Sequence, residues 1–367
     1  MSEDNSRNQE NKKRNSSMNG YSDFNEIIKS VGNKKVAIFT HRCPDPDAMA
    51  SMMGLSWMLR KSHMIESDLF YTGEVSHPQN GVMVNLLSTD LKRLDENYKT
   101  ENYALKILID TIPENAGVNS LNIVFDVVID HHRECPNNYQ GILIHKKVGA
   151  CASIIFDMMK HFVDKDDWLD EDQDVDQKLA TALIAGIVTD TEYMTSDDST
   201  EFEFKAYTEL FPFRNSNFLK QIVFFKRPKL WIDKKAEACT QARVSEDGIA
   251  IVGLGIIPEK HRDLIADMAD EMVHWTSVET AIAFGVVGGE RIEGSVRSLN
   301  PCLTVSDFCK KLGGKHGSGG GKHGKGAYKL PLAGFSFDPD EEDDDVDEAW
   351  ESIKKRETKR IARAMQK

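Results

Sequence analysis

Four apolar segments of the chain are each followed closely by histidine or aspartate. Carboxylates and imidazoles are ligands for divalent cations, and they are also groups for acid–base catalysis. These positions are therefore candidates for a metal-dependent active site. In chain order the residues are His41, Asp45 and Asp47, then Asp110, then Asp130, His131 and His132, and last Asp190.

The apolar segments have the character of buried strands and helices. Residues 35–40, 104–109 and 123–129 are rich in β-branched residues and predict strands. Residues 48–59 and 149–161 predict helices between and after them. In a parallel sheet with right-handed crossovers all carboxyl ends of the strands lie at one edge. We therefore expect the polar residues to meet at one edge of an α/β sheet.

Several aspartates at one buried edge would repel one another unless a cation lay among them. Carboxylates with imidazoles and without thiolates suit Mn²⁺ or Mg²⁺, with Zn²⁺ or Co²⁺ as alternatives. The acids outnumber what one ion needs, which favours a two-metal site for displacement at phosphorus. Helix N-capping is an alternative role for Asp45 and Asp47, but capping needs only one of them and does not need His41.

The order HRCPDPDA, an isolated strand-terminal Asp, DHH and TDT resembles the DHH phosphoesterase superfamily. This superfamily includes single-strand exonucleases, nanoRNases with pAp phosphatase activity, cyclic-dinucleotide phosphodiesterases and manganese pyrophosphatases. The motifs cover about residues 36–201, and the forms DHHRE and GIVTDTEYMTSDDSTEF are most similar to the nanoRNase and cyclic-dinucleotide branches. The resemblance implies a parallel-sheet catalytic domain that holds two Mn²⁺ ions, with Mg²⁺ or Co²⁺ as alternatives.

The resemblance also implies a role for each residue. Asp110 would bridge the two ions. The catalytic residues would be His132, which would face the substrate phosphate or the leaving group, and Asp130, which would orient the histidine ligands. The other residues implied are His41 and Asp45 for one ion, Asp47, His131 and Asp190 for the other, and Arg133 for the substrate.

A second α/β region begins near residue 243, with strands predicted at 249–254, 280–287 and 292–299. It contains a tandem glycine-rich heptad, GGKHGSG and then GGKHGKG, over residues 313–326. Glycines let a backbone approach a ligand closely and expose N–H groups to an anion. We therefore predict a substrate cradle here, with a flexible linker as the alternative.

This region resembles the type 1 DHH-associated domain, whose GGGGH signature and upstream GSxRS arginine bind the phosphates and base end of the substrate. Lys322 stands where that signature usually has its last glycine, and His316 in the first heptad is an alternative to His323. The substrate-binding residues implied are Arg297, Ser298, Gly319, Gly320, Gly321 and His323.

Composition bounds the domain organisation. Residues 1–20 are too polar to offset the entropy of ordering, so we expect a disordered lead. We then expect a catalytic domain at 21–205, a helical linker at 206–242 and a DHH-associated domain at 243–337, with a cleft between the two domains. Residues 338–367 form an acidic and then basic tail, whose oppositely charged halves could fold back on each other or bind a protein partner.

The net charge of −13 and a pI near 5.4 argue against a protein that coats nucleic acid through a basic surface. A small anionic substrate is still compatible, because bound cations reverse the local field. The six cysteines are scattered without a CxxC pair, which favours a reducing compartment. No run approaches the roughly 18 apolar residues of a membrane span. We expect no signal peptide and a cytoplasmic location.

Together these features predict a Mn²⁺-dependent phosphodiesterase of the exonuclease or oligoribonuclease type, acting on short or single-stranded oligonucleotides through water activated by two metal ions. The alternatives are a cyclic-dinucleotide phosphodiesterase, a pAp phosphatase and a non-catalytic nucleotide-binding scaffold. A pyrophosphatase is disfavoured because its partner domain lacks a GGGH-type loop. Assembly as a homodimer stays open.

Overall fold

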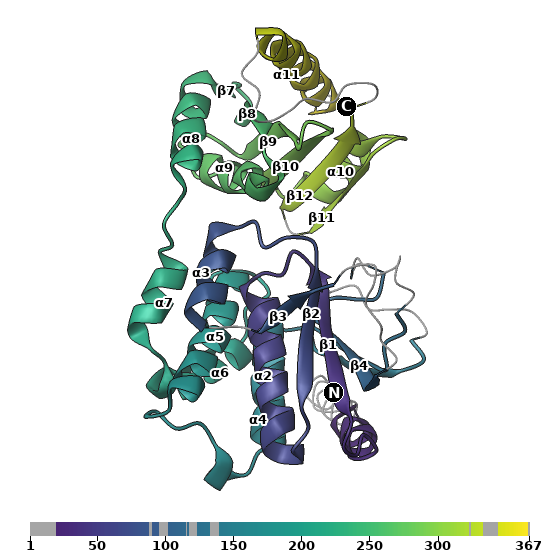
Figure 1. Cartoon of the computed structure of the whole chain (residues 1–367). Coiled ribbons are helices and arrows are strands. Elements are labelled where there is room, and N and C mark those ends of the chain that lie inside the picture. The colour runs from purple at the N-terminus through teal and green to yellow at the C-terminus, as the bar shows by residue number, and fades with distance from the viewer. Residues whose placement is uncertain are drawn as a thin grey trace, which may run out of the picture. The chain divides into compact units, whose positions relative to one another are not determined.

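The computed structural model describes residues 20–87, 90–94, 102–114, 116, 123–132, 139–322, 324–332 and 344–365. The chain divides into two compact units, Met1–Lys226 and Arg227–Lys367, so the division falls within the predicted helical linker. In the described residues each unit contains one six-stranded sheet (Figure 1). The predicted fold class, a parallel-sheet α/β domain followed by a smaller α/β domain, is confirmed. The cleft expected between the domains stays a prediction.

Unit 1 is built on a parallel sheet with the strand order β3-β2-β1-β4-β5-β6. The order reverses direction between β1 and β4, and in open α/β sheets ligands bind outside the carboxyl ends of the strands at such a point. His41 and Asp110 lie at the ends of these two strands. The strands are β1 Lys35–Arg42, β2 Ser67–Thr72, β3 Leu91–Arg93, β4 Tyr103–Ile109, β5 Val127–Asp130 and β6 Ile142–His145.

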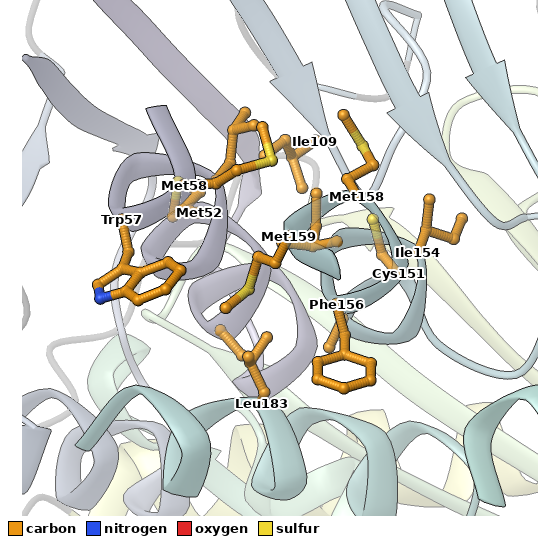
Figure 2. Close-up of a cluster of buried hydrophobic side chains, with 14 of the residues drawn as sticks. Met52, Trp57, Met58, Ile109, Cys151, Ile154, Phe156, Met158, Met159 and Leu183 are labelled. Atoms are coloured by element: carbon orange, nitrogen blue, oxygen red, sulfur yellow. The ribbon is translucent and has the colours of Figure 1, made fainter. Parts of the chain in front are cut away.

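Helices cover one face of this sheet and form the larger apolar core of unit 1 with it. Figure 2 shows Met58, Met159 and Leu183, from three different helices, in one apolar cluster. Gly186 lets its helix come close to the backbone of Asp47, because a Cβ at residue 186 would lie 3.0 Å from Cα of Asp47. A helix also covers residues 20–29. The others are α2 Pro46–His63, α3 Pro78–Leu87, α4 Cys151–Phe162, α5 Asp174–Asp190, α6 Glu201–Leu210 and α7 Ser216–Val223, with 3₁₀ turns at Lys165–Asp167 and Phe211–Phe213.

One ligand candidate comes from a helix rather than a strand. We expected the polar residues to follow strands, but Asp190 is the last residue of α5. The segment 178–188 is small and apolar, and a short apolar run does not separate a buried helix from a buried strand. The fourth group thus reaches the sheet edge from the helical layer.

Unit 2 has the strand order β11-β12-β10-β9-β8-β7, antiparallel except for the β8–β9 pair. Alternate residues of β9 enter two separate cores, one with α8 and α9 and one with α10 and α11. The elements are α8 Lys229–Gln241, β7 Arg243–Val244, β8 Ile249–Ile257, α9 Leu264–Met272, β9 Thr280–Val287, β10 Arg291–Ser298, α10 Val305–Gly313, β11 Ser318–Lys322, β12 Lys325–Pro331 and α11 Asp344–Met365, with a 3₁₀ turn at Glu259–His261.

The acidic and basic tail folds back on unit 2. Helix α11 begins at Asp344, inside the acidic run, and continues through the basic segment. Its Ile361 is buried in the core that includes β9 and α10. Tyr328 Oη donates a hydrogen bond of 2.7 Å to the buried Glu357. Residues 338–343 of the acidic run lie outside the described residues.

Among the residues that the structure describes, no helix combines the length and apolar character needed to cross a membrane.

Candidate metal centre

Asp110 lies between two histidines at the carboxyl edge of the parallel sheet. Its Oδ2 is 3.6 Å from Nε2 of His41, and its Oδ1 is 3.3 Å from Nε2 of His131. The residue directly follows β4 and has a left-handed backbone with φ of 60°. Among residues with a side chain, aspartate and asparagine tolerate this conformation best. The two carboxylate oxygens therefore face two different clusters.

The first cluster consists of His41, Asp45 and Asp110, with ligand atoms within 4.8 Å of one another. Asp45 Oδ1 accepts a hydrogen bond of 3.0 Å from the backbone N–H of Ala48 and caps α2. Its Oδ2 lies 3.8 Å from Nε2 of His41. Capping and cation binding can therefore use different oxygens of one carboxylate, so the two expected roles do not exclude each other.

The second cluster consists of Asp47, His131 and Asp190, within the same limit of 4.8 Å. His131 Nε2 lies 3.3 Å from Asp190 Oδ2 and 3.9 Å from Asp47 Oδ2. Both oxygens of Asp47 also accept hydrogen bonds, of 2.6 and 2.7 Å, from the backbone N–H groups of Cys151 and Ala152 at the start of α4. These amides fix the carboxylate and add the favourable field of a helix N-terminus.

The two adjacent histidines are oriented by different groups. His131 Nδ1 lies 3.0 Å from the carbonyl oxygen of Val148, which as acceptor directs Nε2 to the aspartates. His132 Nδ1 lies 2.8 Å from Oδ1 of the buried Asp130. The expectation that Asp130 supports His131 is therefore wrong, because the side chains of successive residues turn in different directions after β5. Asp130 orients His132, whose side chain is partly exposed.

The carboxylates and imidazoles shift one another's pKa values strongly. Burial alone lowers the pKa of His131, but the nearby carboxylate of Asp110 raises it to about 11. The pKa of His41 also rises well above its usual value, because the nearby carboxylates of Asp110 and Asp45 outweigh the effect of burial. Burial raises the pKa of Asp110, but the two histidines bring it well below its usual range. Burial and repulsion from Asp110 raise the pKa of Asp47.

The site fits a divalent cation in two respects. Asp110 Oδ1 is buried without a hydrogen-bond partner, although His131 lies nearby, so this oxygen has unused acceptor capacity. A third group, formed by Asp110, His131 and His132, links the two clusters. The donor set of carboxylates and imidazoles suits Mn²⁺ better than thiolate-preferring ions.

We expect Mn²⁺ binding to release protons at pH 7. The raised pKa values mean that His131 and His41 are protonated in the metal-free protein, and an imidazole binds a cation only after losing that proton. Affinity should therefore increase with pH. In the metal-free protein, the raised pKa of His131 stabilises the fold fully below its ordinary 6.5, and this contribution is lost as the pH rises toward about 11.

Isothermal titration calorimetry in two buffers of different ionisation enthalpy measures the protons released. We expect at least one proton per protein at pH 7. Release of none at any pH between 6 and 8 would contradict protonated imidazoles in this site.

Some supporting residues were not predicted. Asn80 Nδ2, from α3, donates a hydrogen bond of 2.9 Å to the carbonyl of Pro44 and so holds the loop with Asp45 and Asp47. His145, the last residue of β6, contacts the carbonyl oxygen of His132 through Nε2 at 2.5 Å. Their partners are distant in sequence, so the only signal was the position of His145 directly after the apolar residues 142–144.

In unit 2 the predicted anion clamp already has an acidic partner. Arg297 Nε and Nη2 donate to the two carboxylate oxygens of Asp270 at 2.5 and 3.0 Å. Its Nη1 donates to Ser295 Oγ at 2.7 Å and to the carbonyl of Val296 at 3.1 Å. Most N–H groups of the guanidinium are thus occupied, and an incoming anion must compete with Asp270.

We expect two substitutions to change KM in opposite directions. Arg297→Ala should raise KM for an anionic substrate, because a clamp contributes binding rather than chemistry. Asp270→Asn should lower KM by about two- to fivefold, consistent with a partly exposed ion pair worth up to about 1 kcal/mol. Steady-state kinetics at low salt measure both, with the exposed Asp307→Asn as a control. A higher KM for Asp270→Asn would mean that Asp270 only positions the arginine.

The glycine-rich repeat forms a strand and a hairpin, rather than an open cradle. Gly319 packs against α10, where a Cβ would lie 2.0 Å from the carbonyl oxygen of Cys309. A Cβ on Gly321 would lie 2.3 Å from the carbonyl oxygen of Lys325 on the paired strand. Gly320 alone of these three glycines faces open space. Packing therefore accounts for two of the three predicted cradle glycines.

The two heptads lie at opposite ends of β11. The second spans the hairpin in which Lys322 pairs with Lys325, next to Ser298, whose N–H donates to the carbonyl of Gly324 at 2.7 Å. The first ends within β11, and its His316, before the strand, lines a cavity of about 640 Å³ with residues of α11. His316 is thus separated by a strand from the predicted binding loop. His323 and Arg133 lie outside the described residues.

Part of the chain matches a protein-family model. Residues 35–187 match the model described as DHH family, N-terminal domain. An uncharacterized protein of Methanocaldococcus jannaschii is 30% identical over 320 residues, covering 86% of this chain and 63% of that protein. Cyclic-di-AMP phosphodiesterase GdpP of Bacillus subtilis is 23% identical over 296 residues, covering 75% of this chain and 42% of that protein. A probable manganese-dependent inorganic pyrophosphatase of Streptococcus agalactiae is 24% identical over 168 residues, covering 44% of this chain and 50% of that protein.

The chain thus spans 42% to 63% of the length of these relatives. Among solved structures, an exopolyphosphatase-related protein from Bacteroides fragilis superposes with a TM-score of 0.66 at 15% sequence identity, covering 94% of this chain and 98% of that one. At this identity the likeness supports the fold alone.

Proposed function

Since this chain belongs to the DHH family, with residues 35–187 as its N-terminal domain, we propose that it is a divalent-metal-dependent phosphodiesterase that hydrolyses short or single-stranded oligonucleotides. The observation that carries this proposal is Asp110, which belongs to the first cluster and also lies 3.3 Å from His131 of the second. Such an arrangement suits a pair of cations acting on one phosphoryl centre. The candidate ligands are His41, Asp45, Asp47, Asp110, His131 and Asp190.

When bound, two Mn²⁺ ions would supply Lewis-acid charge and lower the pKa of water. The chain's own contribution beyond the ligands is His132. Asp130 accepts from its Nδ1, which fixes the tautomer and leaves Nε2 available in a side chain that is partly exposed. Once Nε2 is protonated, the imidazolium can donate a hydrogen bond to a phosphate oxygen or give this proton to the leaving oxygen.

The extent of the similarities favours a phosphodiester over pyrophosphate. The match to the cyclic-di-AMP phosphodiesterase covers 75% of the chain, which is more than the 226 residues of unit 1 can supply, so it extends into unit 2. The match to the pyrophosphatase spans 168 residues, 44% of the chain. Hydrolysis of cyclic dinucleotides is for this reason the second candidate function. The net charge of −13 favours small substrates over duplexes.

A turnover screen with Mn²⁺ tests the proposal. The substrates are RNA and DNA oligonucleotides of two to five residues, longer single strands, pAp, cyclic di-AMP and pyrophosphate. We expect the highest kcat/KM with short oligonucleotides, and no turnover after chelation of the metal. A preference for cyclic di-AMP would select the second candidate, and a preference for pyrophosphate would overturn both.

A further inference from the structure

We propose that Glu203, on α6, is a positioning residue that fixes Asp47 and His131 in the second ligand cluster. The inference rests on the proposed metal centre. Glu203 is fully buried, and both of its oxygens accept hydrogen bonds. Oε1 accepts from the N–H of Gly149 at 3.0 Å and from Ser153 Oγ at 2.8 Å. Oε2 accepts from the N–H of Thr200 at 2.8 Å and from its Oγ1 at 2.7 Å.

The segment held by Oε1 contacts two members of the cluster. On one side of Gly149, the carbonyl oxygen of Val148 lies 3.0 Å from Nδ1 of His131. On the other side, the N–H groups of residues 151 and 152 donate to the two oxygens of Asp47. One buried carboxylate thus anchors the backbone that sets both the ring orientation of His131 and the position of Asp47.

The third member of the cluster is tied to the same segment by packing. A Cβ on Gly149 would lie 2.6 Å from Cγ2 of Thr191 and 3.3 Å from Cδ of Glu203. Thr191 directly follows Asp190, the last residue of α5. Gly149 therefore fits between Glu203 and the residue after Asp190, and a shift of this glycine would reach all three ligand candidates.

A helix cap alone does not account for this geometry. Thr200 and Glu203 form a capping box at the start of α6, and such a box uses one carboxylate oxygen on the helix's own N-terminus. Here the other oxygen is directed to Gly149, 54 residues earlier in the chain. The two oxygens serve two functions, one local to α6 and one for the ligand cluster, and separate substitutions can distinguish them.

The test compares Mn²⁺ binding by metal-free wild type, Glu203→Gln and Thr200→Ala, measured from the free-ion signal in electron paramagnetic resonance. Glu203→Gln keeps the volume but places an amide where two sets of donors need a carboxylate. We expect one of two binding sites to weaken by about 10- to 100-fold, the range for residues that orient ligands. Thr200→Ala removes the cap of the same helix and one donor to Oε2, but it keeps the contact between Oε1 and Gly149. It should therefore lower the melting temperature and weaken Mn²⁺ binding much less than Glu203→Gln does.

Ser153→Ala removes one donor to Glu203 and should give a smaller loss at the same site, which keeps the proposal testable if Glu203→Gln does not fold. If the folded Glu203 and Ser153 variants bind Mn²⁺ as tightly as wild type, the positioning role of Glu203 is overturned and the proposed metal centre is not affected. Equal weakening in Thr200→Ala would also overturn it, because general loosening of α6 would then explain the effect. Absence of Mn²⁺ binding by wild type would instead overturn the proposed metal centre itself.

Discussion

Asp110→Asn is expected to lower kcat by about a thousandfold or more. The substitution removes the one carboxylate that faces both ligand clusters, and charge stabilisation by a bound cation contributes several kcal/mol to such reactions. Asparagine keeps the shape of the side chain and tolerates the left-handed backbone of residue 110, where φ is 60°. We therefore expect the fold to be retained, whereas alanine would add backbone strain.

Steady-state kinetics and Mn²⁺ stoichiometry check this prediction together. We expect the stoichiometry to fall from two ions to one, or both affinities to weaken. Asp233→Asn, which removes an exposed acid on α8, is the matched control and should leave both quantities unchanged. A kcat within tenfold of wild type for Asp110→Asn, in a protein that still binds two ions, would exclude a bridging role.

His132→Gln is expected to lower kcat by about 100- to 1000-fold while Mn²⁺ affinity stays close to that of wild type. General acid–base catalysis by one positioned side chain contributes this much, and the ring of His132 is held by Asp130. Asp130→Asn should cost about 10- to 100-fold, because it acts through the histidine. In the double variant the two losses should not add, since both disable one imidazole.

The pH profile of kcat separates this role from simple loss of structure. If His132 is the acid–base group, its ionisation forms one side of this profile. That pH dependence should disappear in His132→Gln and move to a different pH in Asp130→Asn. His145→Gln is the control for loosening the same segment, because it removes only the contact with the carbonyl of His132. Loss of Mn²⁺ binding in His132→Gln would show instead that His132 is a metal ligand, an outcome that its proximity to Asp110 allows.

The ligand candidates could be selected from the sequence because each one follows an apolar segment closely. Chain order and parallel topology were sufficient to bring His41, Asp110 and His131 to one sheet edge. The source of Asp190 was not predictable in this way, because a small apolar run has no period that separates helix from strand. The partner of Asp130 depends on side-chain directions after a strand, which sequence spacing does not encode.

Supporting contacts were harder to predict for a different reason. The sequence Thr200-x-x-Glu203 matches a capping box and could have been read as a helix start. Nothing local indicates that the other oxygen of Glu203 contacts Gly149. The glycine repeat is ambiguous for another reason. Glycines such as Gly319 and Gly321 suit a ligand cradle, but they also suit strands packed against other backbone.

The folding back of α11 has a consequence for how this protein can be shortened and produced. The ring centroid of Trp350 on this helix lies 6.0 Å from that of Phe284 on β9, and Ile361 of the same helix is fully buried in this core. A chain that ended before Asp344 would leave the apolar side chains of this sheet face in water, where they favour self-association. Helix α11 therefore shields this apolar sheet face from water. A recombinant form of unit 2 should retain residues through Met365.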